Sequence, residues 1–531
     1  MVAAGVRTGF DGSMQQTQIS PVELGTGPLT ETEVVAIARE GAEVRLSESA
    51  RTAIAETRAV IERLADNPIP HYGISTGFGA LATRHIPLDQ RTQLQRSLIR
   101  SHAAGSGPEV ETEVVRALML LRLATLATGR TGVRLETAET LAALLNAGIT
   151  PVVHEYGSLG CSGDLAPLAH CALALMGEGP VRDRDGNRRP AAEAMAAAGI
   201  TPVTLAEKEG LALINGTDGM LGMLVLALHD LRRMARTADL AAAMSVEGLL
   251  GTDDVFAADL QALRPHPGQA TSAANLRALL ANSEIRESHR DPAACTRVQD
   301  AYSLRCSPQV AGAVRDTIEH ASAVAGRELA AAIDNPVVTP DGRVESNGNF
   351  HGAPVGYVLD FLAIAVADLA SISERRTDRF LDRARNNGLN PFLADDPGVD
   401  SGQMIAQYTQ AAMVSEAKRL ATPASVDSIP SSAMQEDHVS MGWSAARKLR
   451  RSIDLLTRVL AVEVLTAARG IDLRAPLRPS PATAAAIGVL REQVAGPGPD
   501  VFLAPQLEAT VALVRDGSLL TAAETVTGPL L

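Results

Sequence analysis

Long stretches of helical periodicity are the feature that most constrains the fold of this chain. Apolar residues recur at helical spacing over ranges that exceed the usual length of a helix in a globular protein: 217–250, 308–333, 354–382 and 437–469. Ala and Leu dominate many stretches and only 3% of residues are aromatic, which suits close helix packing more than broad β-sheets. We therefore predict a mainly α protein, built on a bundle of long helices packed against one another.

The chain length supports a division into several segments. Its 531 residues exceed one ordinary domain. Thr30 and Glu33 stand at capping-box spacing, and Gly41 can end the helix that they start. We predict a flexible tail, an N-terminal region with Gly-rich loops, a central long-helix bundle and a C-terminal helical region: 1–28, 29–216, 217–475 and 476–531. The last segment is expected to begin with a turn-rich linker, 476–499.

Charge and cysteine content limit the partners and the compartment. The 48 Lys and Arg against 61 Asp and Glu give a formal net charge of −13, which repels nucleic acid and anionic membranes. The four cysteines lack the paired spacing of a zinc site and are too few to stabilise so large a chain by disulfide bonds. The N-terminus has no apolar core of signal-peptide length, and the apolar runs are judged too short for a membrane span. We expect a cytoplasmic protein.

Two loops rich in Gly and Pro interrupt the helical pattern, at 67–87 and 148–167. Chemistry commonly sits on loops that a rigid scaffold holds in place, so these loops are the first candidates for an active site.

The second loop carries Cys161, Ser162 and Gly163 within a segment, 156–170, that resembles the signature of the histidine and phenylalanine ammonia-lyase family. In that family an internal X-Ser-Gly tripeptide cyclises and dehydrates into 4-methylideneimidazole-5-one (MIO). Cys161 stands where Ala is commoner, a departure that should change a substituent and leave the ring intact. Motifs from Tyr72 to Met441 follow the family's order, so the resemblance covers most of the chain.

The residue types suit that chemistry. The Gly163 nitrogen must approach the carbonyl carbon of residue 161, and glycine permits the tight backbone that this requires. Ser162 must lose its hydroxyl as water, which leaves an electrophilic methylene that no standard side chain supplies. An isolated Ser-Gly-Asp would more simply be a helix-entry turn, capped by Ser162 or Asp164. The long match favours the prosthetic group.

The first loop contains Tyr72 in a segment, 72–79, that resembles the family's Tyr-Gly-x-x-Thr-Gly-Phe-Gly motif. The resemblance implies that Tyr72 is the general base at the substrate's β-carbon. A phenol ordinarily titrates at about 10, so the site must lower that pKa or supply a positive field. Without the resemblance, Tyr72 would be interpreted as a loop tyrosine that anchors a turn.

Further motifs supply the remaining candidates. The segment 299–305 is similar to Gln-Asp-x-Tyr-Ser-x-Arg, which implies that Arg305 grips the substrate carboxylate while Gln299 and Tyr302 line the site. Ala301 stands where histidine lyases often have proline. Asn215 lies in a segment that resembles the one carrying the family's active-site asparagine. Phe350 lies in a segment that resembles the family's Asn-Phe-His motif. Without the resemblance these residues could be a surface ion-pairing arginine, a helix-entry asparagine and a core aromatic.

Two features bear on substrate choice. His102 occupies a position where phenylalanine lyases tend to carry apolar residues, and an imidazole there can hydrogen-bond a polar ring. Glu436 lies in a segment, 435–441, that resembles a run typical of histidine lyases. The alternatives are a core histidine satisfied by backbone and a solvated acidic helix start.

The resemblance implies non-oxidative deamination of L-histidine to trans-urocanate and ammonia, in a homotetramer whose active sites are shared between subunits. The scheme requires no metal. Attack on the methylene by the substrate's amine or by its imidazole stays open. Other MIO enzymes, such as tyrosine or phenylalanine lyases or aminomutases, and an inactive helical scaffold are the alternatives. The related fumarase and aspartase signature is not found in the sequence.

Overall fold

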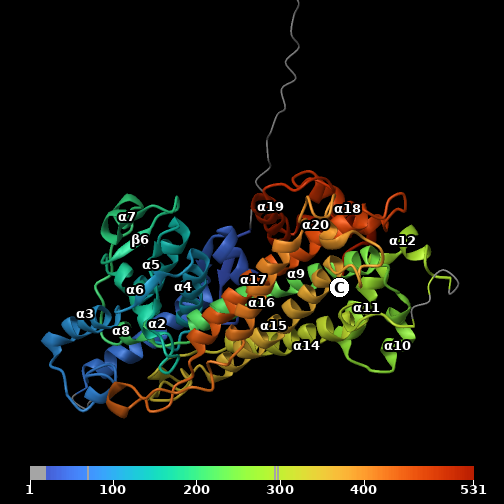
Figure 1. Ribbon diagram of the computed structural model, residues 1–531. Helices are drawn as coiled ribbons and strands as arrows, with labels where there is room; N and C mark the ends of the chain where they lie inside the picture. The colour runs from blue at the N-terminus through green and yellow to red at the C-terminus, as the bar shows by residue number, and fades with distance from the viewer. Residues whose placement is uncertain (1–19, 68–70, 292–294, 296–297) are drawn as a thin grey trace, which may run out of the picture.

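A computed structural model describes residues 20–67, 71–291, 295 and 298–531 (Figure 1). The protein is mainly α-helical, which confirms the predicted fold class. Four long helices run through its centre: α9 (Asp218–Gly248), α14 (Ser307–Leu329), α15 (Ala353–Leu381) and α17 (Gly442–Asp472). Their mutual contacts, with α16 (Met404–Leu420) against α15 and α17, form the predicted bundle. Helix α17 starts later than predicted because residues before it belong to a loop, and Met441 has a φ of 54°.

The N-terminal part packs shorter helices around one end of this bundle (Figure 1). The capping box of Thr30 and Glu33 is present, and the helix that it starts ends at Gly41, with a φ of 74°. The helices of this part are α1 (Glu31–Val35), continued by the π-helix Ala36–Glu40, α2 (Glu48–Ala65), α3 (Arg91–His102), α4 (Thr112–Ala127), α5 (Leu135–Ala147), α6 (Leu165–Leu175), α7 (Ala191–Ala197) and α8 (Glu209–Ile214).

Short strands fasten the connections between these helices. Antiparallel pairing joins β3 (Ser106–Glu109) to β5 (His154–Tyr156), β6 (Pro180–Arg182) to β4 (Thr150–Pro151) and β7 (Arg188–Pro190), and β8 (Val337–Val338) to β9 (Val344–Glu345). Strands β1 (Val22–Leu24) and β2 (Val44–Leu46) pair in parallel. Val22 and Leu24 are buried, so this part of the predicted tail 1–28 is a packed strand; residues 1–19 lie outside the described residues.

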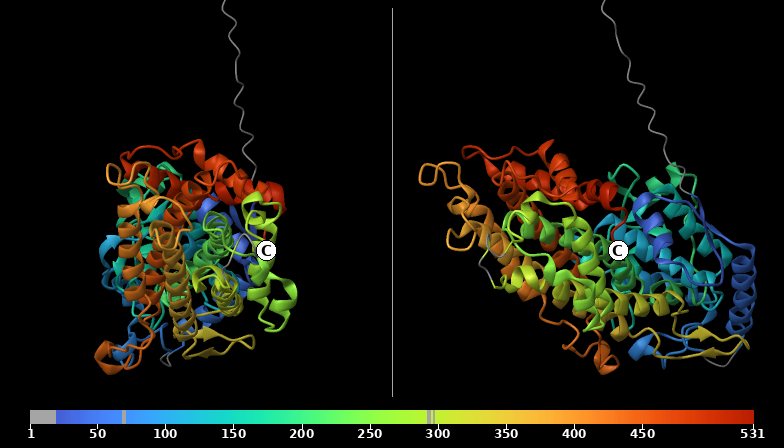
Figure 2. Two further views of the ribbon diagram at one scale, coloured as in Figure 1. Left: turned by 45° about the vertical axis from the view of Figure 1, so that its right-hand side comes forward. Right: turned by 90° about the vertical axis from the view of Figure 1, so that its right-hand side faces the viewer.

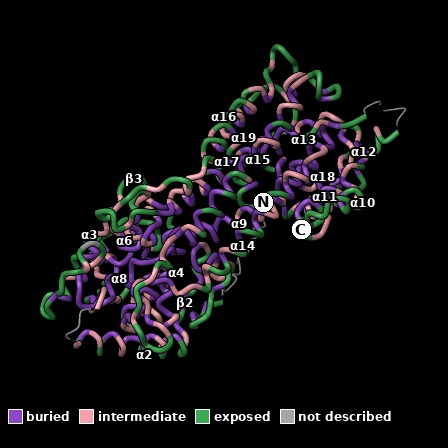
Figure 3. Tube along the Cα trace, turned by 90° about the horizontal axis from the view of Figure 1, so that it is seen from below, coloured by how far each residue is buried: buried purple, intermediate pink, exposed green. Residues whose placement is uncertain are grey.

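The C-terminal helices lie along one side of the bundle, coloured red in Figures 1 and 2. They are α18 (Pro481–Arg491), α19 (Leu503–Asp516) and α20 (Ser518–Thr527). Helix α18 falls inside the stretch predicted as a linker, which is a correction. Ser480 caps its first turn, Pro481 suits that turn, and Ala482, Ala486 and Leu490 bury its inner face. The short helices α10 (Ala258–Ala262), α11 (Pro267–Leu280), α12 (Glu284–Glu287) and α13 (Tyr302–Arg305) lie at the other end of the bundle from α3 and α8 (Figure 3).

Two apolar helical stretches pass a membrane-span test by length and composition, Glu209–Gly248 and Ala353–Leu381. The expectation that every apolar run is too short is therefore wrong. The apolar window of the first stretch is 100% buried, because α9 is the core helix of the bundle. The window of the second is 61% buried, and α15 turns Tyr357, Phe361 and Ile364 outward, where each is about half exposed.

Candidate active site

A cleft between the N-terminal part and one end of the bundle contains most of the predicted site. One cavity of about 650 Å³ is lined by Tyr72, His102, Ser162, Asn215 and Glu436, among others. An adjoining cavity of about 470 Å³ is lined by Cys161 and Phe350 and again by Tyr72, Ser162 and Glu436. The shared residues make the two cavities parts of one cleft. Their size suits an amino acid substrate.

The tripeptide loop adopts a backbone that requires glycine. Gly163 has a φ of 79°, and a Cβ built on it would lie 2.1 Å from the carbonyl oxygen of Gly216. The same stretch contains Gly160, with a φ of 66°. A side chain at position 163 would collide with fixed backbone, so this glycine is required by both conformation and space.

Asp164 ties the loop to the start of α9. Its Oδ2 accepts hydrogen bonds from the backbone N–H groups of Gly219 and Met220, both at 2.9 Å, and its Oδ1 accepts one from Ser158. Burial raises the pKa of Asp164 to about 7. The carboxyl group thus satisfies N–H groups in the first turn of α9 and holds Gly163 against Gly216.

Asp164→Asn is expected to remove a pH-dependent part of the stability. Because the pKa is raised from 3.8 to about 7 by folding, the native protein is destabilised as pH rises through this window. The variant does not titrate there. The free energy of unfolding of the wild type, measured in urea relative to that of the variant, should fall by roughly 2–4 kcal/mol between pH 4 and pH 7.5. Parallel midpoints for both proteins would refute the buried acid; Asp437→Asn, at an exposed carboxyl, is the control.

Asn215 lies in the break between α8 and α9 and reaches the tripeptide. Its Nδ2 donates to the carbonyl oxygen of Ser162 at 2.9 Å. The buried guanidinium of Arg122 holds the break through the carbonyl oxygens of Ala212 and Asn215 and pairs with Asp218. The Asn215 amide is therefore a fixed donor, positioned to stabilise negative charge on that carbonyl oxygen.

Glu436 also contacts the tripeptide, through Ser162 and Cys161. Its Oε1 accepts a hydrogen bond from the Ser162 hydroxyl at 2.6 Å, and its Oε2 accepts from Cys161 Sγ at 3.2 Å and from Ser431 Oγ at 3.0 Å. Burial and the Glu436 carboxylate raise the pKa of Cys161 to about 12, so this thiol stays protonated. Nearby, Ser440 donates to the carbonyl oxygen of Gly160 and fixes the loop's entry.

Tyr72 and His102 line the cleft on the N-terminal side. The phenol oxygen of Tyr72 accepts a hydrogen bond from the Gly79 N–H at 3.2 Å. Nδ1 of His102 lies 2.9 Å from the carbonyl oxygen of Leu98, and because a carbonyl only accepts, Nδ1 carries the proton. Burial lowers the pKa of His102, which leaves a neutral ring with Nε2 as an acceptor.

Three predicted site residues lie elsewhere in this chain. Gln299, Tyr302 and Arg305 do not line the cleft, and Tyr302 is 71% exposed. The Arg305 guanidinium stacks on the Tyr302 ring, 4.7 Å from its centroid. Helix α13 lies far along the bundle from α3, α6 and α8 in Figure 3. Within one chain the structure does not bring these three residues to Ser162.

Sequence reasoning missed several residues that build the cleft. Asn335 lines both cavities, and the buried Lys208–Asp334 ion pair lies beside it. Arg122 and Ser431 position Asn215 and Glu436 respectively. The Asp-Asn-Pro run at 334–336 was the only local signal for Asn335, whereas Arg122 stands in an ordinary helical stretch.

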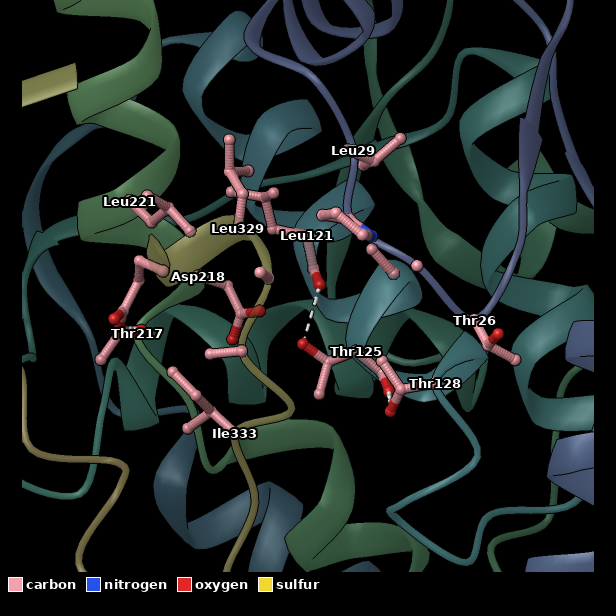
Figure 4. A pocket seen from close by; sticks show the side chains of 16 residues that line it. Thr26, Leu29, Leu121, Thr125, Thr128, Thr217, Asp218, Leu221, Leu329 and Ile333 are labelled. Carbon is pink, nitrogen blue, oxygen red and sulfur yellow. Dashed lines mark hydrogen bonds between the residues drawn. The ribbon is translucent and has the colours of Figure 1, made fainter. Parts of the chain in front are cut away.

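A further, smaller cavity lies beside the start of α9 (Figure 4). It is lined by Leu121, Thr125, Thr217, Asp218 and Leu221, among others, and has a volume of about 50 Å³. This space is too small for an amino acid, unlike the cleft at Ser162.

Comparison with known proteins places this geometry in a family. The model of the aromatic amino acid lyase family matches residues 29–492. Histidine ammonia-lyase of Streptomyces avermitilis is 68% identical over 510 residues, which cover 96% of this chain and 99% of that protein.

Solved structures agree with this result. Histidine ammonia-lyase from Trypanosoma cruzi is 39% identical, with a TM-score of 0.87 over 95% of both chains. A tyrosine aminomutase from Streptomyces globisporus is 38% identical, with a TM-score of 0.90 over 96% of this chain and 100% of that one. From its sequence motifs, its cleft and these similarities, the chain belongs to the aromatic amino acid lyase family of enzymes.

Proposed function

We propose that the protein deaminates L-histidine to trans-urocanate and ammonia, with an MIO group formed from Cys161, Ser162 and Gly163. The observation that carries the proposal is the tripeptide loop lying beside polar His102 and Glu436 in one cleft. The high identity to proteins named histidine ammonia-lyase supports this choice of substrate.

The residues present fit the prosthetic group. Gly163 is pressed against Gly216 where any Cβ would collide, and the Asn215 amide donates to the Ser162 carbonyl oxygen. When formed, MIO supplies an electrophilic methylene that turns the substrate's amino group into a better leaving group. Asn215 then holds the oxygen on which negative charge develops. The scheme requires no metal.

Tyr72 is the proposed general base. It faces the same cavity as Ser162, and its oxygen already accepts one N–H donor. Removal of the β-proton by this oxygen, with departure of the amino group, gives the conjugated product.

His102 and Glu436 are proposed to recognise the substrate ring. A neutral His102 offers Nε2 as an acceptor, and Glu436 adds a carboxylate, so both can accept an imidazole N–H. A phenyl ring offers neither group a partner, and leaving buried polar groups unpaired is costly.

His102→Leu tests this assignment of substrate. We expect kcat/KM for L-histidine to fall roughly 10²-fold, because a buried hydrogen-bonding site loses its partner, while activity on L-phenylalanine gains far less. The measurement compares L-histidine, L-tyrosine and L-phenylalanine in the wild type and the variant. Unchanged histidine use in the variant, or a wild type that prefers tyrosine, would contradict the proposed substrate.

The active sites are proposed to be shared in a homotetramer. Arg305, Tyr302 and Gln299 are the motif residues without a role in their own chain's cleft, and an arginine fork is needed to grip the substrate carboxylate. The outward apolar face of α15, with Tyr357, Phe361 and Ile364, gives the bundle a surface for packing against a second copy.

Mixing two inactive variants tests the shared site. Ser162→Ala and Arg305→Ala each remove one half of every site. Co-expression should restore about a quarter of wild-type activity, because random assembly joins an intact Ser162 half to an intact Arg305 half in that fraction of sites. A co-expressed mixture that stays as inactive as each variant alone would show that both residues must act within one chain.

We also propose a cytoplasmic location. Cys161, Cys171 and Cys306 form no disulfide in the described part of the chain, which suits a reducing compartment.

An aminomutase is the second candidate, because the solved structures that resemble this chain include a tyrosine aminomutase, with a TM-score of 0.90. It would return ammonia to the β-carbon and release a β-amino acid. Product identification separates the two reactions.

A further inference from the structure

The hydroxyl that must leave Ser162 is already in contact with a carboxyl group. Glu436 Oε1 lies 2.6 Å from Ser162 Oγ. The other carboxyl oxygen is held by Ser431 Oγ at 3.0 Å and Cys161 Sγ at 3.2 Å, so the group is fixed in place before any ring exists. The carboxyl group is therefore placed to take part in ring formation as well as in substrate binding.

Ring formation needs the loss of two water molecules. The first leaves when the Gly163 nitrogen bonds to the carbonyl carbon of residue 161: the carbonyl oxygen departs with the two N–H protons of residues 162 and 163, and a C=N double bond forms between that carbon and the nitrogen of residue 162. In the second, the Cα–H of residue 162 is lost as a proton and its electron pair forms the Cα=Cβ bond. The Cβ–Oγ bond breaks, and because hydroxide is a poor leaving group, the departing oxygen requires a proton.

We propose that Glu436 carries this proton, and so catalyses the dehydration of Ser162. As a carboxylate it accepts the proton lost from the Cα of residue 162 and passes it to Ser162 Oγ. The hydroxyl leaves as water, and Glu436 ends the step as the carboxylate that it was at the start. This inference rests on the proposed function, since it concerns the formation of that function's prosthetic group.

Other acidic groups near the tripeptide are occupied elsewhere. The Asp164 carboxyl is fully buried, and its oxygens accept from Gly219, Met220 and Ser158. The Cys161 thiol donates to Glu436 itself. The Tyr72 oxygen is bonded to the Gly79 N–H. Of the described acidic side chains, Glu436 is the one with a hydrogen bond to Ser162 Oγ.

The test follows the mass of the tripeptide-containing peptide after timed cell-free synthesis. The wild type should lose two waters. Glu436→Gln keeps the size and polarity of the side chain but removes the group that can carry the proton, so its peptide should accumulate with one water lost, and the second loss should slow roughly 10²-fold. Glu436→Asp should restore part of that rate. Ser162→Ala can lose only the first water and calibrates the intermediate, and Asp437→Asn, the exposed neighbour, should behave as wild type.

The outcomes separate this inference from the proposed function, because no substrate is used. A Glu436→Gln peptide that loses both waters at the wild-type rate, or that loses neither, overturns the role of Glu436. A wild-type peptide that retains both waters contradicts the MIO group, and with it the proposed function.

Discussion

Ser162→Ala is expected to give a folded protein that releases no measurable ammonia from L-histidine. The substitution removes the hydroxyl whose loss creates the methylene, so no electrophile can form. Of the packing contacts it loses only the hydrogen bond to Glu436. Activity should fall by roughly 10³-fold or more, because loss of the reactive group removes a chemical step that other residues cannot replace.

The control for this variant is Ser97→Ala, at an exposed serine on the rim of the same cavity. It should retain wild-type turnover and lose both waters from the tripeptide. Comparable thermal unfolding of the two variants would show that the fold survives. Full turnover of histidine by Ser162→Ala would refute the assignment of the electrophile.

Tyr72→Phe is expected to slow the chemical step by roughly 10²- to 10⁴-fold, the usual contribution of a general base. The phenyl ring is kept and the lost oxygen accepts one hydrogen bond, from Gly79. The tripeptide should still lose both waters, so the variant separates formation of the prosthetic group from its use. Single-turnover kinetics measures the step directly.

Tyr156→Phe provides the matched control, since Tyr156 is 67% exposed and does not line the cleft. Its turnover should equal that of the wild type. If Tyr72→Phe shows a near-normal single-turnover rate, another group must take the β-proton.

The long helices could be predicted from the sequence because their burial repeats at helical spacing over many turns. Helix α9 is buried along nearly its whole length, and α17 buries Leu449, Ile453, Leu456 and Leu460 at helical spacing. The strands could not be predicted in this way, since β4 and β8 have two residues each and their pairing depends on distant segments. Helix α18 was missed because prolines and glycines around it outweighed its short apolar face.

In the candidate site, residues that belong to local motifs could be predicted, whereas contacts between distant segments could not. Cys161, Ser162 and Gly163 follow from one local motif, and so does Tyr72. The contact of Glu436 with Ser162 joins residues 274 positions apart, and no local pattern measures its distance. Arg122 and Asn335 belong to no local catalytic motif in the sequence. Arg305 has a clear motif, yet its own chain places it away from the cleft, which a single sequence cannot reveal.

Identification of the products from L-histidine tests the central claim most directly. The purified enzyme, with mass spectrometry confirming both water losses in the tripeptide, is incubated with L-histidine, and the products are separated and quantified. We expect trans-urocanate and ammonia in equal amounts. A β-amino acid isomer of histidine, or no reaction with histidine beside ready turnover of tyrosine or phenylalanine, would contradict it.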